Sequence, residues 1–124
     1  MDDEDALAAV KVGADAIVVS NHGGRQLDGG MSSIRALAAS VEAIGDRAEG
    51  WMDGGIRSGQ DVLRAIALGA RGTMIGRAFL YGLGAKGQAG VRQTLEIIHK
   101  ELDLTLGLCG QSDLAKVDSS ILLK

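Results

Sequence analysis

Apolar residues along this chain alternate between helical spacing and short continuous runs. Three stretches carry apolar residues every three or four positions, the spacing of a helix that buries one side; they cover residues 2–13, 32–45 and 58–69. Each is followed by a short run, at 16–19, 49–52 or 72–75. This order predicts a helix followed by a strand, three times over. The run 16–19 has no polar position, which is typical of a parallel strand covered on both faces, whereas Gly50 makes 49–52 a weak strand by propensity.

Capping signals mark the ends of these helices. The candidate N-caps are Asp2 or Asp3, Ser32 or Ser33, and Ser58, and the closing glycines are Gly13, Gly45 and Gly69. Asp61 stands three residues after Ser58, as in a capping box. The tripeptide Val12-Gly13-Ala14 before one strand corresponds to Leu68-Gly69-Ala70 before another. This faint repeat is typical of a β/α barrel or a doubly wound sheet.

The C-terminal third is predicted to be helical. Helices are expected over 78–83 and 89–106, and a short last helix is expected to begin at Ser112 and to contain Leu114 and Val117. The apolar side of the second helix is marked by Val91, Leu95, Ile98 and Leu102.

Composition limits the class of protein. The chain has 124 residues, enough for one domain, which we expect to cover 1–124. Its 46% hydrophobic content fits a packed core, and the 2% aromatic content predicts that this core is aliphatic. A net charge of −3 argues against a nucleic-acid partner.

Other features predict a cytoplasmic protein without a metal. The acidic start lacks the basic segment of a secretory signal, and no run of about 18 apolar residues is present to span a bilayer. The single cysteine, Cys109, has apolar neighbours and is expected to be a small core residue. The spacing of histidine and cysteine does not suit metal ligation. His99 is expected to be a surface or packing residue.

The turn after the first strand carries the strongest candidate chemistry. It reads Ser20-Asn21-His22-Gly23-Gly24-Arg25-Gln26-Leu27-Asp28. His22 is a candidate general base, because histidine titrates close to neutral pH and its neutral ring accepts a proton. Arg25 can bind a carboxylate through two parallel hydrogen bonds, or form a surface ion pair with Asp28. The place of His22 directly after a buried strand favours a catalytic role for this residue over a structural one.

Two further glycine turns follow the second and third strands. They read Asp53-Gly54-Gly55-Ile56-Arg57 and Ile75-Gly76-Arg77. Free backbone N–H groups and helix N-termini after such turns favour anions, so Arg57 and Arg77 are expected to share one phosphate. Asp53 is suited to accept hydrogen bonds from a cofactor's hydroxyl groups, or to cap its turn. In a β/α barrel, ligand-binding residues collect at the carboxyl ends of the strands, where all three turns fall.

These motifs resemble the family of FMN-dependent 2-hydroxy acid dehydrogenases and oxidases, which includes L-lactate dehydrogenases, glycolate oxidase and mandelate dehydrogenase. The resemblance runs from Asp2 to about Leu123. The first motif is highly specific, whereas the other two are shared with other phosphate-binding barrels such as IMP dehydrogenase. The resemblance implies an α/β fold, the C-terminal part (about three β/α units) of a TIM (β/α)8 barrel. It also implies FMN as cofactor.

The resemblance assigns roles to individual residues. His22 looks like the family's base, which deprotonates the 2-hydroxy acid, and Arg25 looks like the residue that binds the substrate carboxylate. The residues that match the family's FMN contacts are Ser20, Asp53, Gly54, Gly55, Ile56, Arg57, Gly76 and Arg77. Ser20 matches a serine near the flavin ring, the segment from Asp53 to Arg57 runs along the ribityl chain and phosphate, and the last two complete the phosphate site.

The resemblance further implies that this chain is part of a longer enzyme. The family barrel has eight strands, and Met1 matches a point just after the fifth. That strand carries a lysine that contacts the flavin, and the substrate-binding tyrosines and the aspartate that pairs with the histidine also match upstream positions. We therefore expect a full enzyme that oxidises an L-2-hydroxy acid of the lactate, glycolate or mandelate type to the 2-oxo acid. The isolated chain is expected to be nearly inactive.

Two alternatives stay open. The chain could be a non-catalytic module that binds FMN or phosphate through Arg57 and Arg77. It could instead be a structural half-barrel, because three parallel strands leave two unpaired sheet edges, which favour self-association. The second alternative predicts a homo-oligomer.

Overall fold

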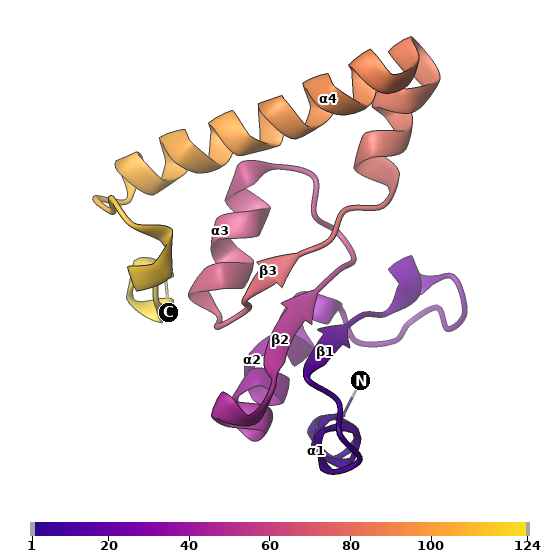
Figure 1. Ribbon diagram of the computed structural model, residues 1–124, viewed down its shortest axis with the longest axis vertical. Coiled ribbons are helices and arrows are strands. Elements are labelled where there is room, and N and C mark those ends of the chain that lie inside the picture. Colours follow the sequence, from indigo (N-terminus) through magenta and orange to yellow (C-terminus); the bar gives the residue numbers. More distant parts are fainter. Residues whose placement is uncertain (1, 124) are drawn as a thin grey trace.

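The computed structural model describes residues 2–123 and contains one parallel sheet of three strands. The strands β1 (Ala16–Val19), β2 (Glu49–Met52) and β3 (Gly72–Thr73) lie side by side in that order (Figure 1). Val19 is the partner of Met52, and Met52 is the partner of Thr73. The strand bounds predicted from the sequence are confirmed for β1 and β2. The predicted third strand, 72–75, is shorter, although the Met74 amide still donates to the Met52 carbonyl at 2.9 Å.

A helix precedes each strand, as predicted. These helices are α1 (Asp3–Lys11), α2 (Ser33–Ile44) and α3 (Gly59–Ala67). Asp2 caps α1 by accepting from the Glu4 amide at 3.0 Å, and this hydrogen bond holds the pKa of the Asp2 carboxyl below its ordinary value. Gly13 and Gly69 end α1 and α3 in the same way, with φ of 102° and 96°. The faint sequence repeat therefore corresponds to a repeated helix end.

The core lies between the sheet and the helices α2 and α3. Its buried members are Val19, Ala36, Leu37, Met52, Ile56, Ala65 and Ala70. Gly50 of β2 faces α2, and a Cβ at this position would press against the side chain of Val41. The glycine that weakens this strand by propensity is thus the residue that lets α2 pack closely on it.

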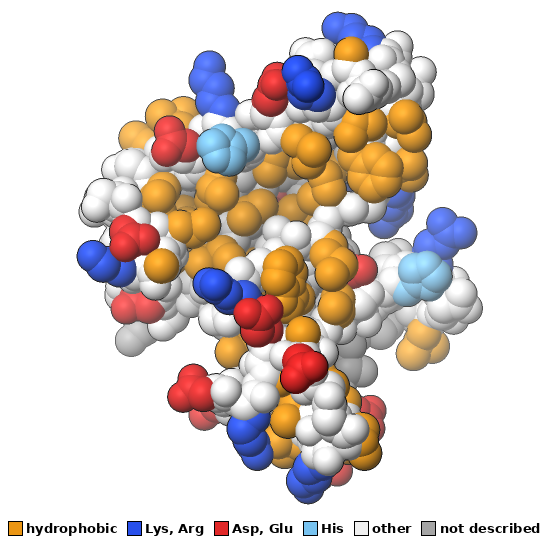
Figure 2. Space-filling model, viewed as in Figure 1, with side chains coloured by type: hydrophobic (Ala, Val, Ile, Leu, Met, Phe, Trp, Pro, Cys, Tyr) orange, Lys and Arg blue, Asp and Glu red, His pale blue; other side chains and the backbone are white. Residues whose placement is uncertain are grey.

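The opposite face of the sheet is open. Val18, which points away from α2, keeps 43% of its surface exposed, and Ala16 is also exposed. The prediction that β1 is covered on both faces is therefore wrong for the described chain, because α2 and α3 pack on one face. On the open face Trp51 lies over Gly72 and donates from its ring nitrogen to Glu49 at 3.0 Å. Figure 2 shows hydrophobic side chains gathered over this side of the molecule.

The long helix α4 (Arg77–Leu108) bends sharply near one end (Figure 1). Lys86 and Gly87 leave the helical conformation there, which agrees with the two helices predicted from the sequence. The two parts cross at Gly82 and Gly90, and a Cβ on either glycine would collide with the backbone of the other. The longer part packs on α3, where Gly59 lies against the backbone of Ile98 and Leu102.

Two predictions for the C-terminal region are wrong. The helix expected from Ser112 is replaced by two short 3₁₀ turns, Leu114–Lys116 and Ser119–Ile121. Cys109, expected in the core, is exposed. It follows the last turn of α4, where Leu108 is also 80% exposed, so apolar neighbours in sequence do not bury it. His99 is exposed on α4, within the surface or packing role expected of it.

Candidate functional site

The three glycine turns meet at the carboxyl edge of the sheet. Because β1, β2 and β3 are parallel, the segments that follow them leave the sheet on the same side (Figure 1). They enclose a cavity of about 390 Å³, a size typical of small-molecule sites. Of the ten predicted site residues, those that line it are His22, Arg25, Asp53, Gly54, Gly55, Ile56, Arg57, Gly76 and Arg77. Ser20 does not line it, but its hydroxyl accepts from the His22 amide at 3.1 Å.

His22 has an unusual backbone conformation. Its φ is +51°, and it is the one residue other than glycine with a positive φ among residues 2–123. Such a conformation is uncommon for a residue with a side chain and occurs often at functional sites. The short 3₁₀ turn His22–Gly24 that it begins ends at Arg25, whose amide donates to the His22 carbonyl at 3.3 Å. The imidazole and the Arg25 guanidinium therefore come from the same tight turn.

Three arginines line the cavity without an acidic partner. Among residues 2–123, the ion pairs join Asp61 to Arg64, Glu49 to Arg71 and Asp113 to Lys116, so Arg25, Arg57 and Arg77 have none there. The alternative pairing of Arg25 with Asp28 is thus not formed. Arg77 reaches from the start of α4 to the first turn, where its guanidinium would lie 2.9 Å from a Cβ at Gly23. Unpaired guanidinium groups around one cavity are suited to bind an anion.

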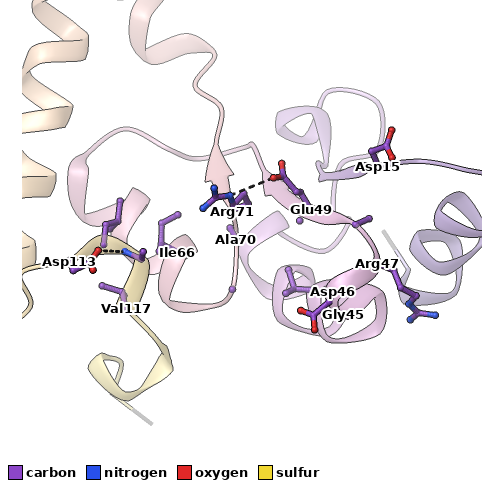
Figure 3. A pocket seen from close by; sticks show the side chains of 16 residues that line it. Asp15, Gly45, Asp46, Arg47, Glu49, Ile66, Ala70, Arg71, Asp113 and Val117 are labelled. Carbon is purple, nitrogen blue, oxygen red and sulfur yellow. Dashed lines mark hydrogen bonds and ion pairs between the residues drawn. The ribbon is translucent and has the colours of Figure 1, made fainter.

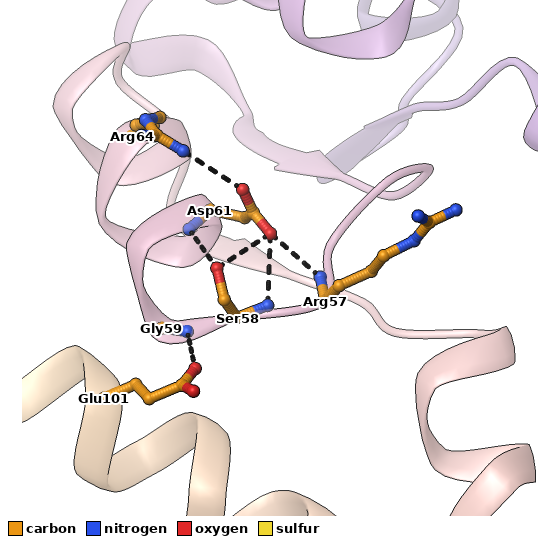
Figure 4. A network of polar contacts seen from close by, with 6 residues as sticks. All are labelled: Arg57, Ser58, Gly59, Asp61, Arg64 and Glu101. Atoms are coloured by element: carbon orange, nitrogen blue, oxygen red, sulfur yellow. Dashed lines mark hydrogen bonds and ion pairs between the residues drawn. The ribbon is translucent and has the colours of Figure 1, made fainter.

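The N-terminus of α3 is already capped by protein carboxylates. Asp61 Oδ2 accepts from the amides of Arg57 and Ser58, each at 3.1 Å, and Glu101 of α4 accepts from the Gly59 amide at 3.0 Å (Figure 4). The free amides expected after the second glycine turn are therefore occupied. The Arg57 side chain points away from this network (Figure 4), so its guanidinium is the group that this turn offers to an anion.

The N-terminus of α4 has no such cap. Its N-cap is Gly76, which has no side chain, and no described side chain accepts a hydrogen bond from the amides of residues 77–79. The first amides of a helix have no partner within the helix and carry a partial positive charge. This helix end, together with Arg57 and Arg77, is therefore the part of the site best suited to a phosphate group.

Asp53 has a buried oxygen that lacks a partner. Its Oδ1 is the one buried side-chain oxygen or nitrogen in the described chain without a hydrogen bond. An unsatisfied buried acceptor destabilises the fold by about 1–3 kcal/mol, so a hydrogen-bond donor at this place would be favoured. Gly55 and Gly76 border the same cavity, and a Cβ on either would meet no atom of the described residues within 4 Å. The turn that carries Asp53 therefore borders a cavity with room for a ligand at Gly55 and Gly76.

The cap of α3 leads to a stability prediction. Replacing Asp61 with alanine is expected to lower the free energy of unfolding by about 2 kcal/mol, because three hydrogen bonds at the helix N-terminus lose their acceptor. Arg64→Ala is the matched control, because it removes only the exposed Arg64–Asp61 ion pair, which contributes less than about 1 kcal/mol. Urea unfolding followed by circular dichroism measures both. Equal losses would contradict the dominant role of the cap.

A larger cavity, of about 980 Å³, lies at the other end of the sheet (Figure 3). Asp15, Glu49 and Arg71 border it together with the C-terminal turn around Asp113. These residues precede or begin their strands, so this cavity is separate from the glycine turns. The ion pair between Arg71 and Glu49, at 3.6 Å, occupies part of its charged lining.

Three residues near the site were not among those predicted to act there. Asn21 and Ser33 hold the turn that carries His22, and Glu101 caps α3 from a segment 42 residues away. Asn21 stands inside the first motif, so its position was a usable signal. The contacts of Ser33 and Glu101 depend on the packing of separate helices, and no local pattern marks them.

Comparison with known proteins identifies the family. The sequence profile of the FMN-dependent dehydrogenases matches residues 1–124, so the chain belongs to this family of FMN-dependent enzymes. An L-lactate dehydrogenase from Caulobacter vibrioides (strain NA1000 / CB15N) is 56% identical over 122 residues, which is 98% of this chain and 32% of that protein. The chain therefore spans about a third of the length of this relative.

Solved structures agree with the sequence match. A mandelate oxidase variant with a monooxide FMN adduct superposes with a TM-score of 0.91 at 48% identity, over 94% of this chain and 37% of that one. The monotopic membrane protein (S)-mandelate dehydrogenase gives a TM-score of 0.93 at 40% identity, over 98% of this chain and 32% of that one. Within residues 2–123, no helix has the length and apolar character needed to cross a membrane.

Proposed function

We propose that this chain forms the FMN-phosphate and substrate-carboxylate end of an enzyme that oxidises an L-2-hydroxy acid to the 2-oxo acid. The observation that carries the proposal is the meeting of His22, Arg25, Asp53 and the Arg57–Arg77 pair around one cavity. Its relatives include an L-lactate dehydrogenase and a mandelate oxidase, and both lactate and mandelate are 2-hydroxy acids. A side chain on the hydroxy acid is accordingly the variable part of the substrate.

The residues present fit FMN. The uncapped N-terminus of α4 and the guanidinium groups of Arg57 and Arg77 would hold the phosphate. The Asp53 carboxylate, which lines the cavity, would accept a hydrogen bond from a ribityl hydroxyl. Gly54 and Gly55 would let the chain pass close to the cofactor, and Ile56, which is buried, supports their turn from the core. Ser20 would act near the flavin through the turn it stabilises.

The mechanism assigns one task to each polar group. The Arg25 guanidinium binds the substrate carboxylate through paired hydrogen bonds and so orients the hydroxyl-bearing carbon. An imidazole nitrogen of His22 accepts a proton from the 2-hydroxy acid. When bound, FMN supplies the acceptor for the two electrons that the substrate loses. The three arginines also lower the energy of the two anionic groups in the site, phosphate and carboxylate.

The test begins with flavin binding. The full chain is titrated with FMN and with riboflavin, which lacks the phosphate, and flavin fluorescence is followed. We expect saturable binding of FMN and much weaker binding of riboflavin, because the phosphate contributes the charged contacts. Equal affinity for the two flavins would contradict the assigned phosphate site.

The role of His22 is tested by reduction of bound FMN. Under anaerobic conditions with L-lactate or L-mandelate, His22→Gln is expected to lower the rate of flavin bleaching by about 100-fold or more, because the proton acceptor is lost. FMN affinity is expected to stay within about twofold of the parent chain, because the imidazole is placed at the substrate. A rate unchanged by His22→Gln would refute the assignment of the base. Should the parent rate be too slow to measure, the same substitution is made at the matching histidine of the longer relative.

A second candidate is a non-catalytic or self-associating partial barrel. The exposed face around Val18 and the unpaired edges of β1 and β3 favour it, since such edges pair with other strands. In this case residues 1–124 form a partial β/α-barrel domain, binding of FMN survives, and turnover falls far below that of a full-length relative. Sedimentation velocity distinguishes the cases: a concentration-dependent oligomer supports self-association, and a monomer at all concentrations excludes it.

A further inference from the structure

Asn21 and Ser33 connect the turn of His22 to the start of α2. The Asn21 amide donates to Ser33 Oγ at 3.2 Å, and Asn21 Oδ1 accepts from the Gly23 amide at 3.0 Å. The side-chain nitrogen of Asn21 also donates to the Met31 carbonyl at 3.5 Å, near the other end of the same loop. The residues on either side of His22 are therefore both fixed: the Asn21 backbone amide by Ser33, and the Gly23 backbone amide by the Asn21 side chain.

Ser33 is itself firmly placed. It is 2% exposed, although it is the first residue of α2 and serine is ordinarily a surface residue. The preceding residue, Ser32, is the N-cap and makes no capping hydrogen bond with its side chain. The buried hydroxyl therefore serves the neighbouring loop and not the end of its own helix.

The same two atoms touch the segment assigned to the cofactor. A Cβ at Gly54 would lie 2.9 Å from Ser33 Oγ and 3.0 Å from Asn21 Oδ1. Gly54 has a φ of +81°, so its backbone fits against this pair only as glycine. The turn that carries His22 and the turn that follows Asp53 therefore both pack against the Asn21 and Ser33 side chains.

We propose that Asn21 and Ser33 are positioning residues that hold His22 in its left-handed backbone conformation and set its place relative to the FMN-binding turn. The inference rests on the proposed function, because it concerns the orientation of the His22 imidazole. The left-handed conformation is uncommon for histidine, and the hydrogen bonds on both sides of the residue compensate for it. Neither residue touches the substrate in this scheme.

The first test uses Ser33→Ala in the isotopically labelled full chain without flavin. We expect the Asn21 and Gly23 amides to exchange with solvent about tenfold faster, because a buried hydrogen bond is lost. We also expect the strong intraresidue amide–Hα contact that marks a positive φ at His22 to weaken in the NMR spectrum. Ser33→Thr keeps the hydroxyl and should restore both signals. The matched control is Ser40→Ala, a buried serine of α2 without a hydrogen bond to this loop, and it should change neither.

A second pair of variants keeps the test decisive if Ser33→Ala fails to fold. Asn21→Ala removes the acceptor for the Gly23 amide, whereas Asn21→Asp retains it. The first should lose the His22 signal and the second should keep it. The proposal is overturned if Ser33→Ala behaves like Ser40→Ala, or if the two Asn21 variants are alike. Since no flavin is present, these outcomes are independent of the FMN titration that tests the proposed function.

Discussion

Replacing Arg77 with alanine is expected to weaken FMN binding by about tenfold to a hundredfold. A charge-assisted hydrogen bond contributes about 1.5–3 kcal/mol, and Arg77, the first residue of α4, supplies such a donor to the cavity that this helix end borders. Its guanidinium also reaches the turn at Gly23, so the substitution removes a contact between the first and third glycine turns. Flavin fluorescence titration of the parent and variant chains measures the change in dissociation constant.

Arg71→Ala is the control for this experiment. It removes the same charge, but Arg71 lies at the far end of the sheet, where it pairs with Glu49. Screening at physiological salt acts over about 8 Å, so this variant should bind FMN within about twofold of the parent. If both variants lose affinity equally, net charge and not contact with phosphate explains the effect. Riboflavin provides a second check, because Arg77→Ala should hardly change its binding.

Replacing Gly90 with alanine is expected to lower the free energy of unfolding by about 3 kcal/mol. The added methyl group would collide with the backbone carbonyl of Gly82, and backbone atoms cannot move aside as a flexible side chain can. The bend of α4 would have to open, which would shift the short part of the helix that begins at Arg77. Urea unfolding followed by circular dichroism gives the loss directly.

Gly84→Ala, in the same helix, should have the opposite sign. Among residues 2–123, no atom lies within 4 Å of a Cβ at Gly84, so alanine gains helix propensity without a collision. The expected gain is about 0.5–1 kcal/mol. A similar stability for the two variants would mean that the two parts of α4 do not cross in solution as closely as in this structure.

Local sequence patterns predicted the elements that have local causes. The bounds of β1 and β2, the capping box of Ser58 with Asp61, and the glycine ends of α1 and α3 all follow from residues close together in the chain. The predictions failed where burial depends on distant segments. Cys109 has apolar neighbours and is nevertheless exposed, and Val18 lies in an apolar strand and still keeps 43% of its surface exposed. Apolar residues in sequence indicate that burial is favourable but do not supply the covering element.

The candidate site divides in the same way. The amino-acid sequence by itself determined the family, the three glycine turns and the residue types that suit a hydroxy acid and a phosphate, because those types and their spacing are written in contiguous motifs. Only the tertiary structure decided which helix end remains free. Asp61 and Glu101 accept from the amides at the start of α3, while within residues 2–123 no side chain caps α4. Glu101 stands 42 residues from Gly59, whose amide it holds. Hydrogen bonds between distant segments depend on how helices pack, and the order of residues along one turn does not contain that information.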